Sequence, residues 1–387
     1  MKLSRKHLGG VAIVAAAVAI TVLWFRLHAT ESLPAAAAPL ADLAETSGPS
    51  TPATRARRVL APLLKEVPGL SVSVWAGGGI AWSEGLGYAD LKSRTPVRPS
   101  TLFRVYSLSK PLTAAAALSL AGDRLLDLDA PIATHVSGLP PDVGRVTARQ
   151  LLGHLGGIRD YKDGEWLRVS RSGCRSAGEA LAPFVNDPLQ HPPGDAFLYS
   201  SFGYVLLSAV IEGASGLNFE ACLRRRVFEP AGLVETLMDP PGGDPAATAT
   251  FYEPAPFGRV RRARAVENGC KLGAGSLLST SEDLARFSGA LIEGKAPAPS
   301  SVELMLRPMT VASGESTGYG CGFGLSRDKA GRPFASHRGG AIGGRGVLLV
   351  YPLEKVAVVV LSNIDGPSMA KEAFEVAELF MTPEDGR

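Results

Sequence analysis

Two stretches rich in β-branched residues, near opposite ends of the chain, restrict its fold more than any other feature. In residues 70–84, alternating apolar and polar side chains surround the tight turn AGGG (Ala76–Gly79) and predict a β-hairpin. In residues 346–361, two apolar runs separated by PLEK (Pro352–Lys355) predict a second hairpin. An amphipathic helix is expected to follow over residues 368–381. Strands are therefore expected from both ends of the chain.

The middle of the chain has a different pattern. From about residue 111 to residue 305, most segments look helical and are separated by loops rich in proline and glycine. The predicted fold class is therefore α+β, with an antiparallel sheet built from both termini and flanked by helices, and with an all-helical insertion. We expect one domain over residues 59–387, its sheet-bearing part formed by about 59–110 and 306–387.

The N-terminal residues predict export. Residues 8–25 carry no charge, and more positive charge precedes this run, at Lys2, Arg5 and Lys6, than follows it, at Arg26. Its length is close to that of a membrane-spanning helix, and its flanking charges favour a cytoplasmic N-terminus. Residues 1–28 are interpreted as a signal anchor, or as a cleaved signal peptide, which leaves the body of the protein on the periplasmic side of the inner membrane. Residues 29–58, rich in Ala, Pro, Ser and Thr, are expected to be a flexible tether.

Charge and cysteine content exclude some functions. The net charge of +3 gives no support for a nucleic-acid partner, which would require a clustered basic face. The histidines and cysteines are not spaced as metal ligands, so neither a metal nor another cofactor is expected. Outside the cytoplasm the four cysteines could form disulfides, and the three possible pairings among them stay open: Cys174, Cys222, Cys270 and Cys321.

The stretch FRVYSLSKPL contains a serine and a lysine three residues apart, Ser107 and Lys110. Pro111 is tolerated only near the start of a helix, so the following helix cannot begin much before Ser107. The two side chains then share a face of its first turn. Residues 111–122 carry no charge, which predicts a buried helix. Lys110 is therefore expected at the edge of a core, where burial disfavours its ammonium form and helps it to accept a proton from a hydroxyl.

The S-x-x-K spacing occurs twice more, and neither copy has a suitable context. Ser326–Lys329 lies in the polar sequence SRDKAGRP, which predicts a turn. Ser368–Lys371 opens the final helix, whose charges predict a solvated lysine. Ser109 is next to Lys110 but points away from the face that Ser107 shares with Lys110. Ser107 is therefore the preferred candidate for a nucleophile.

Two later stretches could complete a site. In YSSFGY, Tyr199 and Ser201 could project together from the start of a helix, or a serine could cap that helix beside a core tyrosine. The sequence SHRGGAIGGRGVLLV contains His337 and five glycines just before a strand. Such glycine density lets a backbone pass close to a ligand, although it also suits a flexible hairpin loop.

In this order the three motifs resemble those of the serine β-lactamase and penicillin-binding-protein superfamily, which has S-x-x-K, then Y-x-N or S-x-N, then K-T-G or H-x-G. The matches here are Ser107–Lys110, Tyr199–Ser201 and His337–Gly339. Further stretches between about residues 59 and 380 are similar to the family as well. The resemblance is closest to class C β-lactamases, their esterase and D-aminopeptidase relatives, and a mitochondrial β-lactamase-like protein.

The resemblance implies a mechanism and a set of roles. Ser107 would attack a carbonyl carbon and form an acyl-enzyme, while Lys110 and Tyr199 would share the general-base and general-acid steps. Lys110, and His337 if it were protonated, would supply the positive charge that a Tyr199 phenolate needs. Backbone N–H groups of Ser107 and Gly340 would form the oxyanion hole. The substrate-binding and oxyanion positions implied are Ser201, His337, Arg338, Gly339 and Gly340.

Two departures from the family pattern affect the expected substrate. Ser201 replaces an asparagine, and its hydroxyl reaches less far than an amide, which argues against strong β-lactamase activity. Arg338 replaces a small Ser or Thr and could clamp a carboxylate or point to solvent, with solvent slightly favoured. Peptidase, β-lactamase and carboxylesterase activities on a small peptide, β-lactam or ester all remain open. So does a non-catalytic, membrane-tethered binder of cell-wall peptides. The sequence does not predict the oligomeric state.

Overall fold

The computed structural model describes residues 30–33, 51–170, 173–174, 176–241 and 243–381. The predicted anchor and most of the predicted tether lie outside the described residues. In the part of the chain that is described, no single helix combines the length and the apolar composition needed to cross a membrane.

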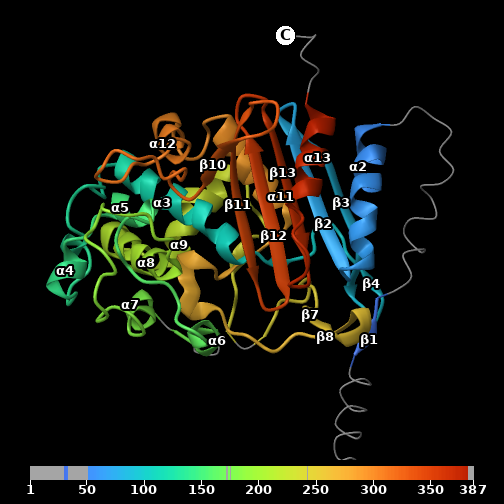
Figure 1. The fold of residues 1–387 in the computed structure, drawn as a ribbon, viewed down its shortest axis with the longest axis horizontal. Helices are drawn as coiled ribbons and strands as arrows, with labels where there is room; N and C mark the ends of the chain where they lie inside the picture. Colours follow the sequence, from blue (N-terminus) through green and yellow to red (C-terminus); the bar gives the residue numbers. More distant parts are fainter. Residues whose placement is uncertain (1–29, 34–50, 171–172, 175, 242, 382–387) are drawn as a thin grey trace, which may run out of the picture.

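A seven-stranded antiparallel sheet joins the two ends of the domain (Figure 1). The N-terminal hairpin pairs with the C-terminal one through β2 and β13, with Val72 opposite Val360. Both predicted hairpins are confirmed, as β2 pairs with β3 and β12 pairs with β13. They form because β-branched residues pack well on a pleated surface. In spatial order the strands are β10 (Gly324–Arg327), β11 (Pro333–Ala341), β12 (Gly344–Tyr351), β13 (Val356–Ser362), β2 (Gly69–Ala76), β3 (Gly79–Asp90) and β4 (Thr95–Pro96).

Helices cover both faces of this sheet. Helices α2 (Pro52–Leu60) and α13 (Ala370–Phe380) pack together on the outer face, and α11 (Ser281–Ile292) packs on the inner face against β2 and β13 (Figure 1). Two buried apolar clusters result, one beneath α2 and α13 and a larger one shared with the helical part of the chain. The sheet therefore has an apolar layer on each side.

Helix α2 corrects the predicted tether, which was expected to extend to residue 58. Thr51 caps the helix by accepting a hydrogen bond from the Thr54 N–H, and Pro52 occupies the first helical turn. Both are ordinary start signals of a helix. Ala56 and Leu60 are fully buried against the sheet, so tertiary packing stabilises a segment that looks unstructured by composition. Within residues 29–58, β1 (Glu31–Ser32) also pairs with a strand of the domain.

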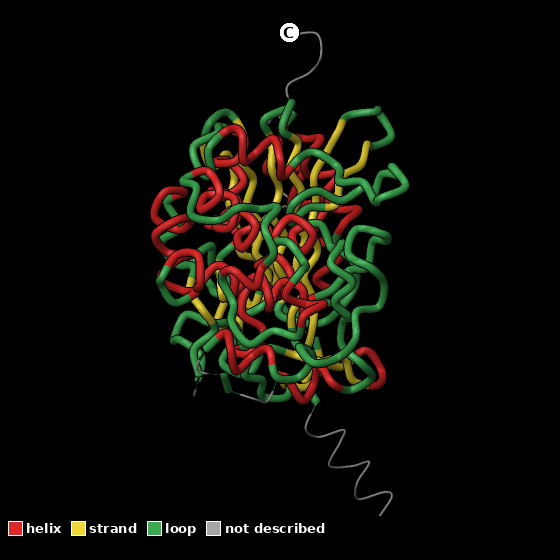
Figure 2. The backbone as a smooth tube through the Cα atoms, turned by 90° about the vertical axis from the view of Figure 1, so that its left-hand side faces the viewer, coloured by secondary structure: helices red, strands yellow, loops and turns green. Residues whose placement is uncertain are grey.

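The regular structure of the inserted part is mainly helical, and Figure 2 shows these helices joined by long loops on the side that faces the viewer. Its longest helices are α3 (Ser109–Gly122) and α8 (Ser201–Ser215). The shorter ones are α4 (Pro141–Gly144), α5 (Ala148–Leu152), α6 (Glu165–Val169), α7 (Ala177–Leu181), α9 (Phe219–Leu223), α10 (Glu229–Ala231) and α12 (Pro299–Met305). Short segments of 3₁₀ or π helix also occur, two of them before the insertion: η2 (Ala61–Lys65) and η3 (Tyr106–Leu108). Those within it are η4 (Ile132–Thr134), η5 (Arg224–Phe228), η6 (Pro256–Gly258) and η7 (Gly269–Ala274).

The prediction that this insertion is all-helical is wrong, although the α+β class is confirmed. Two small three-stranded sheets include strands from the insertion, in the orders β1-β8-β7 and β5-β9-β6. Each strand is two to four residues long, too short for a periodic pattern to be visible in sequence. The strands are β5 (Phe103–Arg104), β6 (Leu237–Met238), β7 (Tyr252–Ala255), β8 (Arg259–Arg262) and β9 (Leu277–Ser279).

Candidate active site

Ser107 lies in the tight turn η3, immediately before helix α3. Tyr106, the preceding residue, has a φ of +47°, a left-handed conformation that is uncommon outside glycine. The Tyr106 side chain is buried, and its hydroxyl donates a hydrogen bond to the carbonyl of Ile342 on the β11–β12 turn. This contact ties the strained turn to the sheet. Ser107 itself is half-buried and accessible from a pocket.

Lys110 is completely buried on the first turn of α3, as the uncharged run behind it predicts. Its Nζ lies 3.0 Å from Ser107 Oγ and donates a second hydrogen bond, also of 3.0 Å, to the carbonyl of Ala274. No carboxylate forms an ion pair with Lys110 among the described residues. A buried amine held against a hydroxyl, without an acidic partner, is well placed to exchange a proton with it.

The segment η7 holds Lys110 from the opposite side. Gly273 donates its N–H to Ser208 of α8, and its carbonyl accepts from the Thr113 hydroxyl of α3. A Cβ atom on Gly273 would lie 2.6 Å from Thr113 Oγ1, so only glycine fits between the two helices. No site role of this segment is predicted from the sequence. Its glycine pattern, GAGS, was the available signal.

The YSS turn lies at the start of α8, beside Lys110. Lys110 Nζ is 5.0 Å from the centroid of the Tyr199 ring. Ser200, rather than Ser201, caps the helix: its hydroxyl accepts from the Gly203 N–H and donates to the carbonyl of Arg159. The Ser201 N–H donates to Asp160 Oδ1 at 3.0 Å. The structure therefore brings Tyr199 and Ser201 to the Ser107–Lys110 pair.

His154 positions Tyr199, a role that the sequence did not indicate. Its carbonyl accepts from the N–H of Leu198, and its Nδ1 accepts from the N–H of Ser200, so it binds the backbone on both sides of Tyr199. The two rings are 4.3 Å apart between centroids. Burial, together with the charge of Lys110, holds the pKa of His154 well below its usual value, which keeps the imidazole neutral.

His337 is on strand β11, rather than in a loop, and it is neutral. Its Nδ1 faces the carbonyl of Arg338 at 2.9 Å and must carry the proton, so Nε2 accepts from the Tyr319 hydroxyl at 3.1 Å. Burial lowers the pKa of His337 to about 3, and the nearby Lys110 acts in the same direction. The prediction that a protonated His337 could stabilise a Tyr199 phenolate is therefore wrong. It failed because the burial of this side chain could not be judged from sequence.

The glycines after His337 let β11 pass directly beside the turn that carries Ser107. A Cβ atom on Gly339 would lie 2.2 Å from the carbonyl oxygen of Val105. Gly340 follows and lines the same pocket as Ser107. Arg338, on the alternate face of the strand, is exposed, as was slightly favoured. The two other S-x-x-K lysines lie elsewhere, and Lys371 is 80% exposed.

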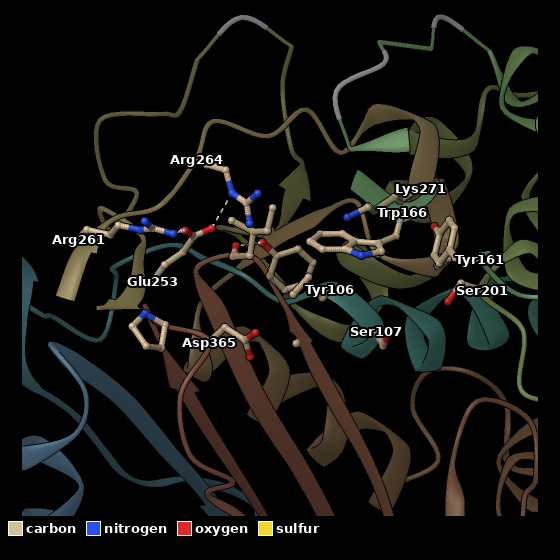
Figure 3. Close-up of a pocket in the computed structure, with 16 residues that line it drawn as sticks. Tyr106, Ser107, Tyr161, Trp166, Ser201, Glu253, Arg261, Arg264, Lys271 and Asp365 are labelled. Carbon is tan, nitrogen blue, oxygen red and sulfur yellow. Dashed lines mark hydrogen bonds and ion pairs between the residues drawn. The ribbon is translucent and has the colours of Figure 1, made fainter. Parts of the chain in front are cut away.

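A cavity of about 510 Å³ opens above Ser107. Of the predicted site residues, Ser107, Ser201 and Gly340 line it, whereas Lys110 and His337 are buried. Other side chains that line it, labelled in Figure 3, are Tyr106, Tyr161, Trp166, Glu253, Arg261, Arg264, Lys271 and Asp365. In the described part of the chain, no group of three or more His, Cys, Asp or Glu side chains is arranged to hold a metal ion.

The fold and the serine–lysine pair define a serine hydrolase. The chain belongs to the Beta-lactamase family, whose model matches residues 56–380. It is 30% identical over 385 residues to the mouse serine beta-lactamase-like protein LACTB, mitochondrial, covering 74% of this chain and 70% of the mouse protein. It is 28% identical to a D-aminopeptidase of Gluconobacter oxydans, over 76% of this chain and 56% of that protein. A solved penicillin-binding protein from Bacillus halodurans superposes with a TM-score of 0.72 at 25% identity, over 84% of this chain and 98% of that one.

These comparisons confirm the predicted resemblance and the serine-hydrolase class. One cysteine pair is also resolved: Cys174 and Cys270 form a disulfide, and Cys222 and Cys321 are free and buried. The disulfide joins the loop after α6 to the start of η7. It therefore restrains the segment whose Ala274 carbonyl binds Lys110.

Proposed function

We propose that the protein is an exported serine hydrolase that cleaves an amide or ester bond of a small peptide, a β-lactam or a related acyl donor through an acyl-enzyme on Ser107. One observation carries this proposal: the buried Lys110 Nζ lies 3.0 Å from Ser107 Oγ and has no carboxylate partner among the described residues. An amine in this position can take the hydroxyl proton as the oxygen attacks a carbonyl carbon.

In the acylation step, Ser107 Oγ forms a bond to the carbonyl carbon while its proton moves to Lys110 Nζ. The carbonyl oxygen becomes an oxyanion, which the N–H groups of Ser107 and Gly340 would stabilise. Tyr199 would then pass a proton to the leaving nitrogen or oxygen as its bond to the carbon breaks. Once it holds the Ser107 proton, Lys110 is the cation that faces Tyr199, at 5.0 Å from the ring centroid, since His337 and His154 are neutral.

In the deacylation step, water attacks the carbonyl carbon of the Ser107 ester and gives a proton to the Tyr199 phenolate that acylation leaves behind. The bond between this carbon and Ser107 Oγ then breaks, the acid product leaves, and Ser107 recovers its proton from Lys110, whose Nζ is 3.0 Å away. Ser201, in place of asparagine, offers a hydroxyl to the substrate from the pocket wall. We therefore expect peptide amides and esters to be better substrates than β-lactams, because the shorter hydroxyl reaches less far toward a lactam side-chain amide.

A substrate panel tests this proposal. D-amino-acid amides, D-Ala-D-Ala peptides, a chromogenic cephalosporin and p-nitrophenyl esters are compared with wild type and Ser107→Ala. We expect turnover of at least one amide or ester by wild type, and a loss of about 10⁴-fold or more in kcat in the variant. Equal turnover by the two proteins would contradict the proposal. Binding without turnover of any substrate would favour the alternative, a non-catalytic binder of cell-wall peptides.

We further propose that residues 8–25 export the domain and anchor it on the periplasmic side of the inner membrane. The uncharged run and the basic residues before it support this, as does the usual oxidising environment of disulfides such as Cys174–Cys270. In a bacterial host, we expect the full chain to sediment with membranes and its domain to be cleaved by a protease added to spheroplasts. A domain protected until the inner membrane is lysed would contradict export.

A further inference from the structure

Lys271 is a second buried lysine at the candidate active site. It belongs to η7, is 6% exposed, and lines the same pocket as Ser107 (Figure 3). Its Nζ lies 5.3 Å from the centroid of the Tyr106 ring. Within the described ranges, its ammonium forms no hydrogen bond or ion pair with a protein group. A buried ammonium with neither a hydrogen bond nor an ion pair is unusual, because removing a charge from water is unfavourable unless another group compensates.

The other charged side chains of the pocket have protein partners. Arg261 and Arg264 both bind Glu253, with nitrogen–oxygen distances of 3.0 Å. Asp365, which also lines the pocket, binds Arg345 at 2.6 Å. Arg261 and Arg264 share one carboxylate and are about half exposed, so solvent screens the positive charge that remains there. Among the described residues, Lys271 is the lining cation that is buried and has no ion-pair partner.

A second polar group of the pocket also lacks a partner. The Tyr161 hydroxyl is buried and forms no hydrogen bond in the described structure. It lines the pocket together with Lys271 and Trp166, as Figure 3 shows. A phenol that donates and an ammonium that donates are complementary to a carboxylate, which only accepts.

The position of Lys271 is fixed by its neighbours in sequence. Cys270 is disulfide-bonded to Cys174, and Gly273 is held between α3 and α8 by its hydrogen bonds to Thr113 and Ser208. The lysine thus lies on a restrained segment, which also supplies the Ala274 carbonyl to the catalytic lysine. A rigid support of this kind favours a binding role over a solvated surface charge.

We propose that Lys271, assisted by the Tyr161 hydroxyl, binds a free carboxylate of the acyl donor and so selects anionic substrates. This inference rests on the proposed function, because it assigns the recognition of a substrate group to the pocket in which Ser107 reacts. Arg338, the basic residue of the third motif, is exposed on strand β11 and does not line this pocket.

Two esters of similar length, differing in charge, test the proposal: mono-4-nitrophenyl glutarate, which carries a carboxylate, and neutral 4-nitrophenyl valerate. For wild type we expect a preference for the glutarate in kcat/KM. Lys271→Met should lower kcat/KM for the glutarate by about tenfold to a hundredfold, the range for a hydrogen bond to a charged group, and leave the valerate within about threefold. Lys271→Arg should retain part of the preference. Lys92→Met, at an exposed turn, is the matched control and should change neither value.

The failures of the two proposals are distinguishable. Wild type that hydrolyses neither ester and forms no adduct on Ser107 would overturn the proposed function together with this inference. Wild type that hydrolyses both, with the same ratio of kcat/KM values as Lys271→Met, would overturn the carboxylate site alone. An equal loss for both esters in Lys271→Met would also overturn it, because that outcome indicates a structural role.

The pH dependence gives an independent test. Burial lowers the pKa of Lys271 to about 8, with the Arg104 and Lys110 charges acting in the same direction and Asp239 opposing them. The ammonium is present below that pH and is lost above it. We therefore expect the glutarate-to-valerate ratio of wild type to fall as pH rises through about 8, whereas Lys271→Arg retains it and Lys271→Met shows no such fall. A flat wild-type ratio from pH 6 to pH 10 would contradict the proposal.

The other titratable groups lining the pocket are Tyr106, Tyr161, Glu253, Arg261, Arg264 and Asp365.

Discussion

Replacing Lys110 with methionine is expected to lower kcat/KM by about 10²–10⁴-fold, the usual contribution of a general acid–base group. The reason is geometric: Lys110 Nζ is 3.0 Å from Ser107 Oγ, and methionine has similar length but cannot accept a proton. The measurement is kcat/KM on the best substrate of the panel. A variant that retains at least a third of wild-type activity would show that Lys110 is not the base.

The same variant should remain folded, because two effects on stability oppose each other. Removing a fully buried polar group favours the folded state, while the Ala274 carbonyl loses its donor, which costs about 1–3 kcal/mol. Circular dichroism and the thermal midpoint check this point. Lys371→Met is a matched control from another S-x-x-K match: that lysine is 80% exposed, and its replacement should alter neither activity nor stability.

Gly339→Ala is expected to have the second large effect, on both stability and activity. The new Cβ atom would lie 2.2 Å from the carbonyl oxygen of Val105, so strand β11 or the turn η3 must move. Overpacking of this kind lowers the free energy of unfolding by about 1–3 kcal/mol. A shift of about 1 Å between Ser107 and Gly340 would lower kcat/KM by roughly a hundredfold.

Denaturant unfolding and kcat/KM of the purified variant measure the two effects of this substitution. Gly79→Ala is the matched control, because this glycine is in the same sheet and a Cβ atom there meets nothing within 4 Å. We expect the control to unfold at a denaturant midpoint close to that of wild type. Wild-type kinetics and stability in Gly339→Ala would mean that β11 does not press against the turn as described.

The serine–lysine pair could be predicted from sequence because its evidence is local. Pro111 limits where the helix starts, and the uncharged run behind it requires burial; both are properties of neighbouring residues. The two hairpins are equally local, since their alternation and turn residues are contiguous. By contrast, helix α2 was missed although Thr51 and Pro52 are ordinary start signals of a helix. Its stability depends on apolar contacts with strands that are distant in sequence, and these contacts cannot be inferred from the segment itself.

The rest of the site depends on contacts between distant segments. The charge state of His337 follows from full burial and from Lys110, which lies more than two hundred residues earlier in the chain. His154 matters because it binds the backbone on both sides of Tyr199. Lys271 is an ordinary lysine in sequence and becomes a candidate binding residue because its segment is held between two helices. Spacing along the chain contains none of this information.

The central claim is that Ser107 becomes acylated, and intact-mass spectrometry tests it most directly. The protein is incubated with benzylpenicillin and, separately, with an activated ester, and any adduct is mapped by tandem mass spectrometry to separate Ser107 from Ser109. We predict a single acyl mass on Ser107 in wild type with at least one donor, its absence in Ser107→Ala, and much slower formation in Lys110→Met. An adduct that persists in Ser107→Ala, or no adduct with any acyl donor, would contradict the account.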